Sequence, residues 1–154
     1  MGERSPINDT DARATFIGMS MDTTRADMAQ AVLEGVAFAI RDSVEIARSL
    51  GIEISASKVC GGGAKSPLWK KIIASVLGVR LEVPACEQGP GMGGAMLAMV
   101  ACGAYDSVQA AADAITATVS VVEPDAELVR RYDEQYKKFK VIYPALRAVY
   151  PVIK

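Results

Sequence analysis

The feature that most constrains this chain is a run of three glycines between an apolar stretch and the start of a helix. Residues 59–67 read VCGGGAKSP. Only glycine lets a backbone turn this sharply and still approach a ligand closely. Ser66 and Pro67 are residues preferred at the N-cap and first position of a helix, and Gly78 is placed to end that helix. A helix start presents free N–H groups and a positive dipole end. The segment therefore predicts a strand–turn–helix unit that either binds a nucleotide or is only a tight turn.

The length and composition are typical of one globular domain. The chain has 154 residues, 51% of them apolar, and a formal net charge of −1. This near balance argues against a surface for nucleic acid or for an anionic membrane. The first residues are polar and have no signal-peptide core, and no apolar run approaches the roughly 20 residues that span a bilayer. We expect a cytoplasmic protein.

Histidine is absent, and there are three cysteines. The absence of histidine removes the commonest general base and the commonest metal ligand. Cys60, Cys86 and Cys102 are odd in number and match no zinc spacing. We expect buried, reduced thiols and no metal site.

Periodicity and end signals predict an alternation of helices and strands. Helices are expected at 24–50, 67–77, 92–102, 107–115 and 125–143, with Pro144 bending or ending the last one, and extended segments at 57–60, 80–83 and 118–123. The first helix carries apolar residues at steps of three and four, namely Met28, Ala31, Val32, Val36, Ala39, Ile40, Val44, Ala47 and Leu50.

This order of elements predicts an α/β fold with parallel strands. Two or three strands are few for a parallel sheet, which normally has more strands and both faces covered. Residues 1–23 are polar, rich in turn residues and without a pattern of their own. The chain therefore has the organisation of part of a larger domain.

Neither glycine segment matches a common nucleotide fingerprint well. The triple glycine is not a Walker A loop, because Ala64 precedes Lys65 where that loop has glycine. Gly89, Gly91 and Gly94 do have the G-x-G-x-x-G spacing of a dinucleotide site. However, the acidic residue about 20 positions further on, Asp113, falls in an expected helix. We prefer to interpret Gly93, Gly94, Ala95 and Ala98 of this segment as a helix face of small residues that lets another backbone pack closely.

Four segments in order resemble one family. Residues 61–69, GGGAKSPLW, resemble the adenosine-binding loop of the FGGY carbohydrate kinases, in particular of its xylulose kinases. Residues 14–34 resemble the C-terminal signature of that family, and residues 2–9, GERSPIND, resemble the segment just before it. Residues 87–98 resemble the start of a later helix. One such match is weak evidence, whereas four matches in the order of the family are specific evidence for the resemblance.

The resemblance implies a fold and a set of site residues. The family fold is a pair of ribonuclease H-like (actin-like) domains, with sugar bound mostly by the N-terminal domain and ATP by the C-terminal one. Residues 1–154 then correspond to the C-terminal portion of the ATP-binding domain, and the N-terminal sugar-binding domain is absent. The residues implied to bind the nucleotide are Gly61, Gly62, Gly63, Ala64 and Ser66. No catalytic or metal-binding residue is implied in this chain.

The resemblance also implies a reaction. A full-length enzyme of this kind transfers the γ-phosphate of MgATP to D-xylulose, and the catalytic aspartate lies outside this segment. We expect the fragment alone to be inactive. Other FGGY kinases acting on glycerol, gluconate or ribulose remain alternatives, as does a non-catalytic nucleotide-binding or oligomerisation module. Because the expected sheet has an open edge beside Val59, we also expect a homo-oligomer.

Overall fold

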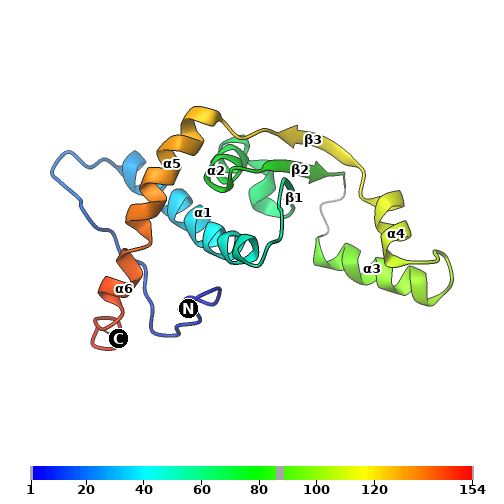
Figure 1. Ribbon diagram of the computed structural model, residues 1–154, viewed down its shortest axis with the longest axis horizontal. Coiled ribbons are helices and arrows are strands. Elements are labelled where there is room, and N and C mark those ends of the chain that lie inside the picture. The colour runs from blue at the N-terminus through cyan, green and yellow to red at the C-terminus, as the bar shows by residue number, and fades with distance from the viewer. Residues whose placement is uncertain (1, 86–88, 154) are drawn as a thin grey trace.

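The structure is a computed structural model that describes residues 2–85 and 89–153 (Figure 1). Helices and strands alternate in the expected order. The elements are α1 (Arg25–Ser49), β1 (Ala56–Lys58), the 3₁₀ turn η1 (Gly62–Lys65), α2 (Pro67–Leu77), β2 (Arg80–Pro84), α3 (Pro90–Ala101), α4 (Val108–Ile115), β3 (Thr118–Val122), α5 (Ala126–Phe139) and α6 (Ile142–Leu146).

The three strands form one mixed sheet in the order β1-β2-β3. β1 and β2 are parallel, as the sequence predicts, and Ser57 lies opposite Leu81. β3 is antiparallel to β2, so the expectation of parallel strands is wrong there. The reason is that α3 and α4 leave and rejoin the sheet at the same end, where Ala85 N donates a hydrogen bond of 2.8 Å to Ala117 O. A strand that re-enters at that end must run back along its neighbour.

The hydrophobic core lies around α2. From Ile72 to Leu77 every residue of this helix is buried, which is the pattern of a helix covered on all sides. α1 and α5 pack against it, and Figure 1 shows all three helices together at one end of the sheet. Phe38 of α1 contacts the rings of Tyr132 and Tyr136 of α5, with both centroid distances 5.9 Å. The aromatic residues of α5 therefore form a packing face.

α1 begins as predicted but buries a different face. Thr24 caps it in a reciprocal arrangement with Asp27. Ala37 and Phe38 are its buried residues, whereas Val32 and Val36, two of the apolar residues at steps of three and four, are 53% and 49% exposed. The spacing of apolar residues did not indicate the buried face correctly, because α1 carries apolar residues on two faces. Only one of these faces packs against other helices among the described residues.

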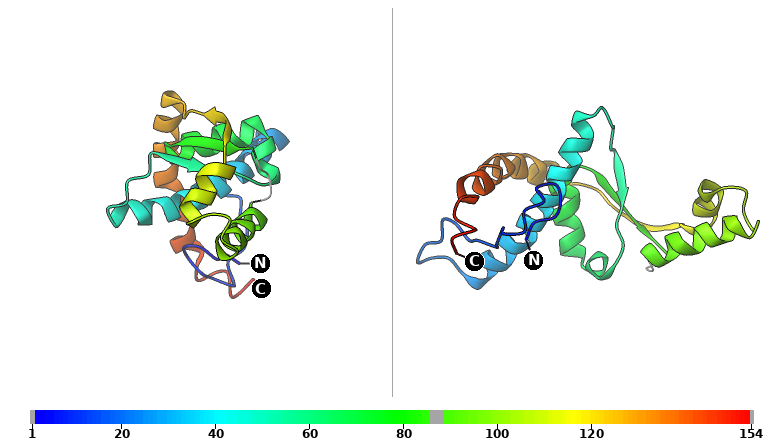
Figure 2. Two further views of the ribbon diagram at one scale, coloured as in Figure 1. Left: turned by 90° about the vertical axis from the view of Figure 1, so that its right-hand side faces the viewer. Right: turned by 90° about the horizontal axis from the view of Figure 1, so that it is seen from below.

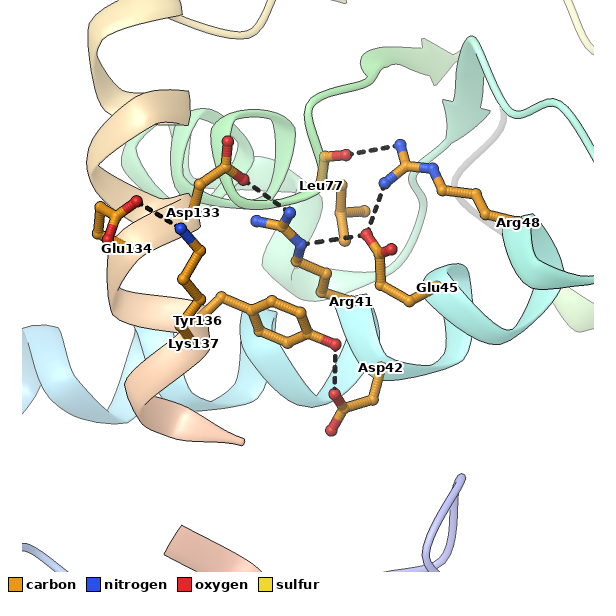
Figure 3. A network of polar contacts seen from close by, with 9 residues as sticks. All are labelled: Arg41, Asp42, Glu45, Arg48, Leu77, Asp133, Glu134, Tyr136 and Lys137. Atoms are coloured by element: carbon orange, nitrogen blue, oxygen red, sulfur yellow. Dashed lines mark hydrogen bonds and ion pairs between the residues drawn. The ribbon is translucent and has the colours of Figure 1, made fainter. Parts of the chain in front are cut away.

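Charged residues of α1 hold α5 and the end of α2 in place (Figure 3). Arg41 pairs with Asp133 of α5 at 2.7 Å and with Glu45 at 3.3 Å, and its guanidinium lies 4.4 Å from the ring centroid of Tyr136. Arg48 pairs with Glu45 at 2.8 Å and donates to Leu77 O at 2.9 Å. These contacts fix the crossing of α1 and α5.

Two further predictions need correction. α5 ends at Phe139, and Pro144 lies inside the separate short helix α6, within its first turn, where the N–H that proline lacks is not needed.

Cys60 and Cys102 are exposed, so the expectation of buried thiols is wrong for both; Cys86 lies outside the described residues. Cys60 is exposed because it belongs to the turn after β1 and not to the strand interior.

α3 and α4 pack on each other and lie side by side beyond the sheet, away from the core (Figure 2). Gly91, Gly93 and Gly94 of α3 have open space where a β-carbon would be. The close approach of another backbone predicted for this helix is therefore not seen at Gly93 or Gly94 within the described residues. No helix in the described part of the chain is both long and apolar enough to cross a membrane.

Candidate functional site

The candidate site is the turn that joins β1 to α2. Gly61 has φ 87° and ψ −178°, a conformation that side chains rarely adopt, so glycine is required there. The next residues form η1, in which Ala64 N donates to Gly61 O at 3.0 Å and Ser66 N donates to Gly63 O at 3.1 Å. The triple glycine is thus a structured turn that delivers the chain directly to the start of α2.

Ser66 caps α2 as the sequence predicts. Its hydroxyl accepts a hydrogen bond of 3.2 Å from Trp69 N, and Pro67 is the first helical residue. The helix ends at Gly78, which is left-handed with φ 63° and ψ 32°. The positive end of the α2 dipole therefore faces the glycine turn, which is the arrangement that favours an anion such as a phosphate.

The indole of Trp69 lies against Gly63, a contact that the sequence reasoning missed. A β-carbon added to Gly63 would lie 2.9 Å from both Cδ1 and Nε1 of Trp69. Gly62, one residue earlier, has nothing within 4 Å of the equivalent position. A side chain at position 63 would therefore clash with Trp69, whereas a side chain at position 62 would meet no neighbouring atom. The only sequence signal for this contact is the tryptophan at the third position of a helix that follows glycines.

The implied site residues differ in what they offer a ligand. Gly61, Gly62, Gly63 and Ser66 are exposed, whereas the side chain of Ala64 is buried at 8% exposure. Burial of Ala64 anchors the turn in the core, and its N–H already bonds to Gly61 O and is not free for a ligand. The surface that a ligand could contact is the backbone of Gly62 and Gly63 together with the start of α2.

The second glycine segment lies beside the first. A β-carbon on Gly89, the N-cap residue of α3, would lie 3.4 Å from Cys60 Sγ, immediately before the triple glycine. The fold therefore brings the starts of α2 and α3 to the same end of the sheet. Asp113 lies within α4, where its carboxylate accepts a 2.8 Å hydrogen bond from Gln109. It is not at the end of a strand, so the G-x-G-x-x-G spacing here lacks the acidic residue of a dinucleotide site.

The described residues, 2–85 and 89–153, contain no group of three acidic, cysteine or histidine residues that could hold a metal ion. Several carboxylates instead have structural partners. Asp9 accepts a 2.7 Å hydrogen bond from Tyr143 OH, which is the main cause that lowers the pKa of Asp9. Asp27 and Asp125 bond to helix-start N–H groups, and these bonds lower the pKa values of their carboxyl groups.

Comparison with known proteins identifies the family. The model of the FGGY family of carbohydrate kinases, C-terminal domain, matches residues 1–102. The xylulose kinase of Staphylococcus epidermidis is 37% identical over 126 residues, which are 82% of this chain and 25% of that relative. A glycerol kinase of Saccharolobus islandicus is 36% identical over 110 residues, 71% of this chain and 22% of the relative.

A solved structure agrees with these matches. The crystal structure of a xylulose kinase from Brucella ovis superposes with a TM-score of 0.82 and 37% identity, covering 94% of this chain and 30% of the other. The chain belongs to the FGGY family of carbohydrate kinases, and its fold is part of their actin-like ATPase fold. It spans about a quarter of the length of the curated relatives it matches.

Proposed function

We propose that this chain is the C-terminal, ATP-binding part of a xylulose kinase. In the full-length enzyme the γ-phosphoryl group of MgATP passes to the 5-hydroxyl of D-xylulose, giving D-xylulose 5-phosphate, ADP and a proton. The observation that carries the proposal is the open turn between β1 and α2, with exposed Gly62 and Gly63 and the Ser66 cap, in a member of the FGGY family.

Each residue of the turn has a distinct role in this proposal. Gly61 makes the turn, Gly62 and Gly63 present backbone to the adenosine and phosphates, Ala64 anchors the turn in the core, and Ser66 orients the start of α2. Mg²⁺ is assigned to no residue of this chain, because the described part has no suitable cluster of ligands. It would be held by the ATP phosphates and by the rest of the enzyme, which also supplies the catalytic aspartate and the sugar site.

The chain alone should bind ATP weakly and phosphorylate nothing. A helix start facing an anion contributes about 0.3–2 kcal/mol. Even a millimolar dissociation constant requires about 4 kcal/mol. Since phosphate transfer depends on positioning and charge stabilisation from several directions, one wall of a cleft does not suffice.

For the phosphate acceptor, one alternative to D-xylulose is supported by a specific observation. The glycerol kinase match covers 71% of this chain, so a polyol acceptor is the second candidate. The ATP-binding role is tested by a chimera in which this chain replaces the matched 126 residues of the Staphylococcus epidermidis xylulose kinase. ADP release is measured with D-xylulose in the chimera and in the intact relative, which supplies the sugar site to both proteins. Release by the chimera supports the assignment of this chain as the ATP-binding part; a chimera that folds but does not use ATP overturns it. The acceptor is tested by joining this chain to the remainder of the glycerol kinase and comparing ADP release by the two chimeras, each with the sugar or polyol of its own remainder.

The nucleotide site has a matched pair of control variants. Ser66 and Ser107 both cap a helix by accepting a hydrogen bond from the N–H three residues on, Trp69 and Ala110, at 3.2 and 3.1 Å. In the chimera, Ser66→Ala should raise the KM for ATP, whereas Ser107→Ala should leave it unchanged. Equal effects of the two variants would show that α2 has no special relation to the nucleotide.

A direct readout of binding comes from the single tryptophan of the chain. Because the Trp69 indole lies on Gly63, a nucleotide at the turn changes its surroundings. Titration of the chimera with MgATP should change Trp69 fluorescence relative to the tryptophan signal of the intact relative. No change at saturating MgATP would favour an oligomerisation module that binds no nucleotide.

A further inference from the structure

The glycine turn needs a support from outside itself to keep one conformation. Glycine has no β-carbon to restrict its backbone, and Gly61, Gly62 and Gly63 follow one another directly. Ordering such a segment around a ligand costs conformational entropy, which weakens binding. A contact that already holds the turn before a ligand arrives therefore strengthens binding.

Gly63 has such a contact, and its partner is Trp69. A β-carbon on Gly63 would lie 2.9 Å from Cδ1 and Nε1 of the indole, so the ring stands where an ordinary residue carries its own side chain. Gly62 has nothing within 4 Å of the equivalent position. Gly63 O also accepts the hydrogen bond from Ser66 N, and the next residue, Ala64, is buried. Gly63 itself is exposed, so its backbone is supported on one side and open on another.

The indole is in turn fixed by the core. Trp69 is half-buried and packs against the hydrophobic core cluster. Ile72 and Ile73, which lie on the same side of α2 one helical turn further on, are buried in that cluster. Trp69 N also donates its 3.2 Å hydrogen bond to the cap residue Ser66. The ring therefore connects the exposed turn to the rigid part of the domain.

We propose that Trp69 is a positioning residue for nucleotide binding: its indole holds the Gly63 backbone in the conformation that receives the nucleotide. The inference rests on the proposed function and adds to it a residue outside the glycine turn. If the turn without this support is in the binding conformation about one tenth of the time, the apparent affinity for ATP falls about tenfold. Because contacts to the adenosine are equally strong in the ground state and the transition state, the loss appears in KM and not in kcat.

The test compares two leucine variants in the chimera with the Staphylococcus epidermidis xylulose kinase. Trp69→Leu removes the ring that lies on the turn. Phe139→Leu is the matched control, because Phe139 is also a half-buried aromatic residue packed against the core cluster, with its ring centroid 5.3 Å from that of Phe38. Phe139 belongs to α5 and not to the turn or to α2. For each variant the KM for ATP, the KM for D-xylulose and kcat are measured.

Trp69→Leu should raise the KM for ATP about tenfold and leave the KM for D-xylulose and kcat within about twofold. Phe139→Leu should leave all three values within about twofold. Trp69→Phe keeps a flat ring beside Gly63 and should bring the KM for ATP to within about threefold of the unsubstituted chimera. The inference is overturned by an unchanged KM for ATP in Trp69→Leu, by an equal increase in Phe139→Leu, or by a Trp69→Phe variant as impaired as Trp69→Leu.

Hydrogen exchange in the same chimera gives a readout without nucleotide. The Ser66 N–H bonds to Gly63 O, so its exchange with solvent reports opening of the turn. This exchange should be at least about tenfold faster in Trp69→Leu and unchanged in Phe139→Leu. Equal exchange rates in the two variants would contradict the positioning role.

The remaining outcomes are also decisive. Should Trp69→Leu fail to fold, Trp69→Met is measured in the same way, because its flexible side chain fills the core without presenting a flat ring to Gly63. An unsubstituted chimera that folds but does not use ATP overturns the proposed function together with this inference. Normal use of ATP by the chimera, with an unchanged KM for ATP in the Trp69 variants, overturns this inference alone.

Discussion

Gly63→Ala is expected to destabilise the chain because Trp69 occupies the place of the new methyl group. The added carbon would lie 2.9 Å from two atoms of a rigid indole ring. Overpacking of this kind costs about 1–3 kcal/mol. The reduced entropy of the unfolded chain offsets about 0.4–1 kcal/mol of that cost. The net expected loss is about 1–2 kcal/mol in the free energy of unfolding, which corresponds to roughly 2–8 °C in Tm for a chain of this size.

Gly62→Ala provides the matched control. Gly62 lies in the same 3₁₀ turn, but nothing lies within 4 Å of its added carbon. This substitution should be neutral, or stabilising by up to about 1 kcal/mol. The comparison therefore separates a steric effect from the general effect of replacing a glycine in the turn.

A double-mutant cycle with Trp69→Ala isolates the contact. With the indole removed, Gly63→Ala should no longer destabilise, so the two substitutions should show a coupling energy of about 1–3 kcal/mol. The assay is urea unfolding followed by far-ultraviolet circular dichroism, which does not depend on the tryptophan. The reasoning is refuted if Gly63→Ala is as stable as Gly62→Ala, or if it costs the same with and without Trp69.

Two further predictions concern stability. Ser66→Ala should lower the free energy of unfolding by about 1 kcal/mol through loss of the α2 cap, as measured by urea unfolding; an unchanged midpoint would show that the cap is not needed. Burial, with Glu34 nearby, raises the pKa of Tyr132 from 10.0 to about 12. The neutral phenol is therefore favoured in the folded state, and its contribution is complete below pH 10 and lost as the pH rises towards about 12. Tyr132→Phe should flatten the fall in stability across that window, and an equally steep fall in both proteins would contradict the assignment.

The sequence predicts α2 well because the signals for its ends are local. Ser66 and Pro67 start the helix and Gly78 ends it, and the structure has the helix at Pro67–Leu77. The direction of β3 and the buried face of α1 could not be predicted, because both depend on contacts between residues far apart in the chain. Where a helix has apolar residues on two faces, periodicity indicates a helix but not which face is covered.

The same distinction applies to the candidate site. The backbone of the turn follows from its glycines, since Gly61 has the positive φ that the sequence suggests. The contact of Trp69 with Gly63 depends on a side-chain conformation that no spacing rule specifies. The exposure of Cys60 depends on where β1 ends, and the ends of strands are among the least certain features of a sequence-based prediction.

The contacts between α1 and α5 have a consequence for how the chain folds. The match to the family model ends at residue 102, yet α5 supplies Tyr132 and Tyr136 to the core. The hydrogen bonds that join the two helices connect residues 92 to 98 positions apart. Such long-range closure slows folding, since much chain entropy is lost before the contact forms. During synthesis on the ribosome, α1 therefore lacks its aromatic partners until residue 139 has emerged. The cooperative folding unit extends well beyond the boundary of the family match.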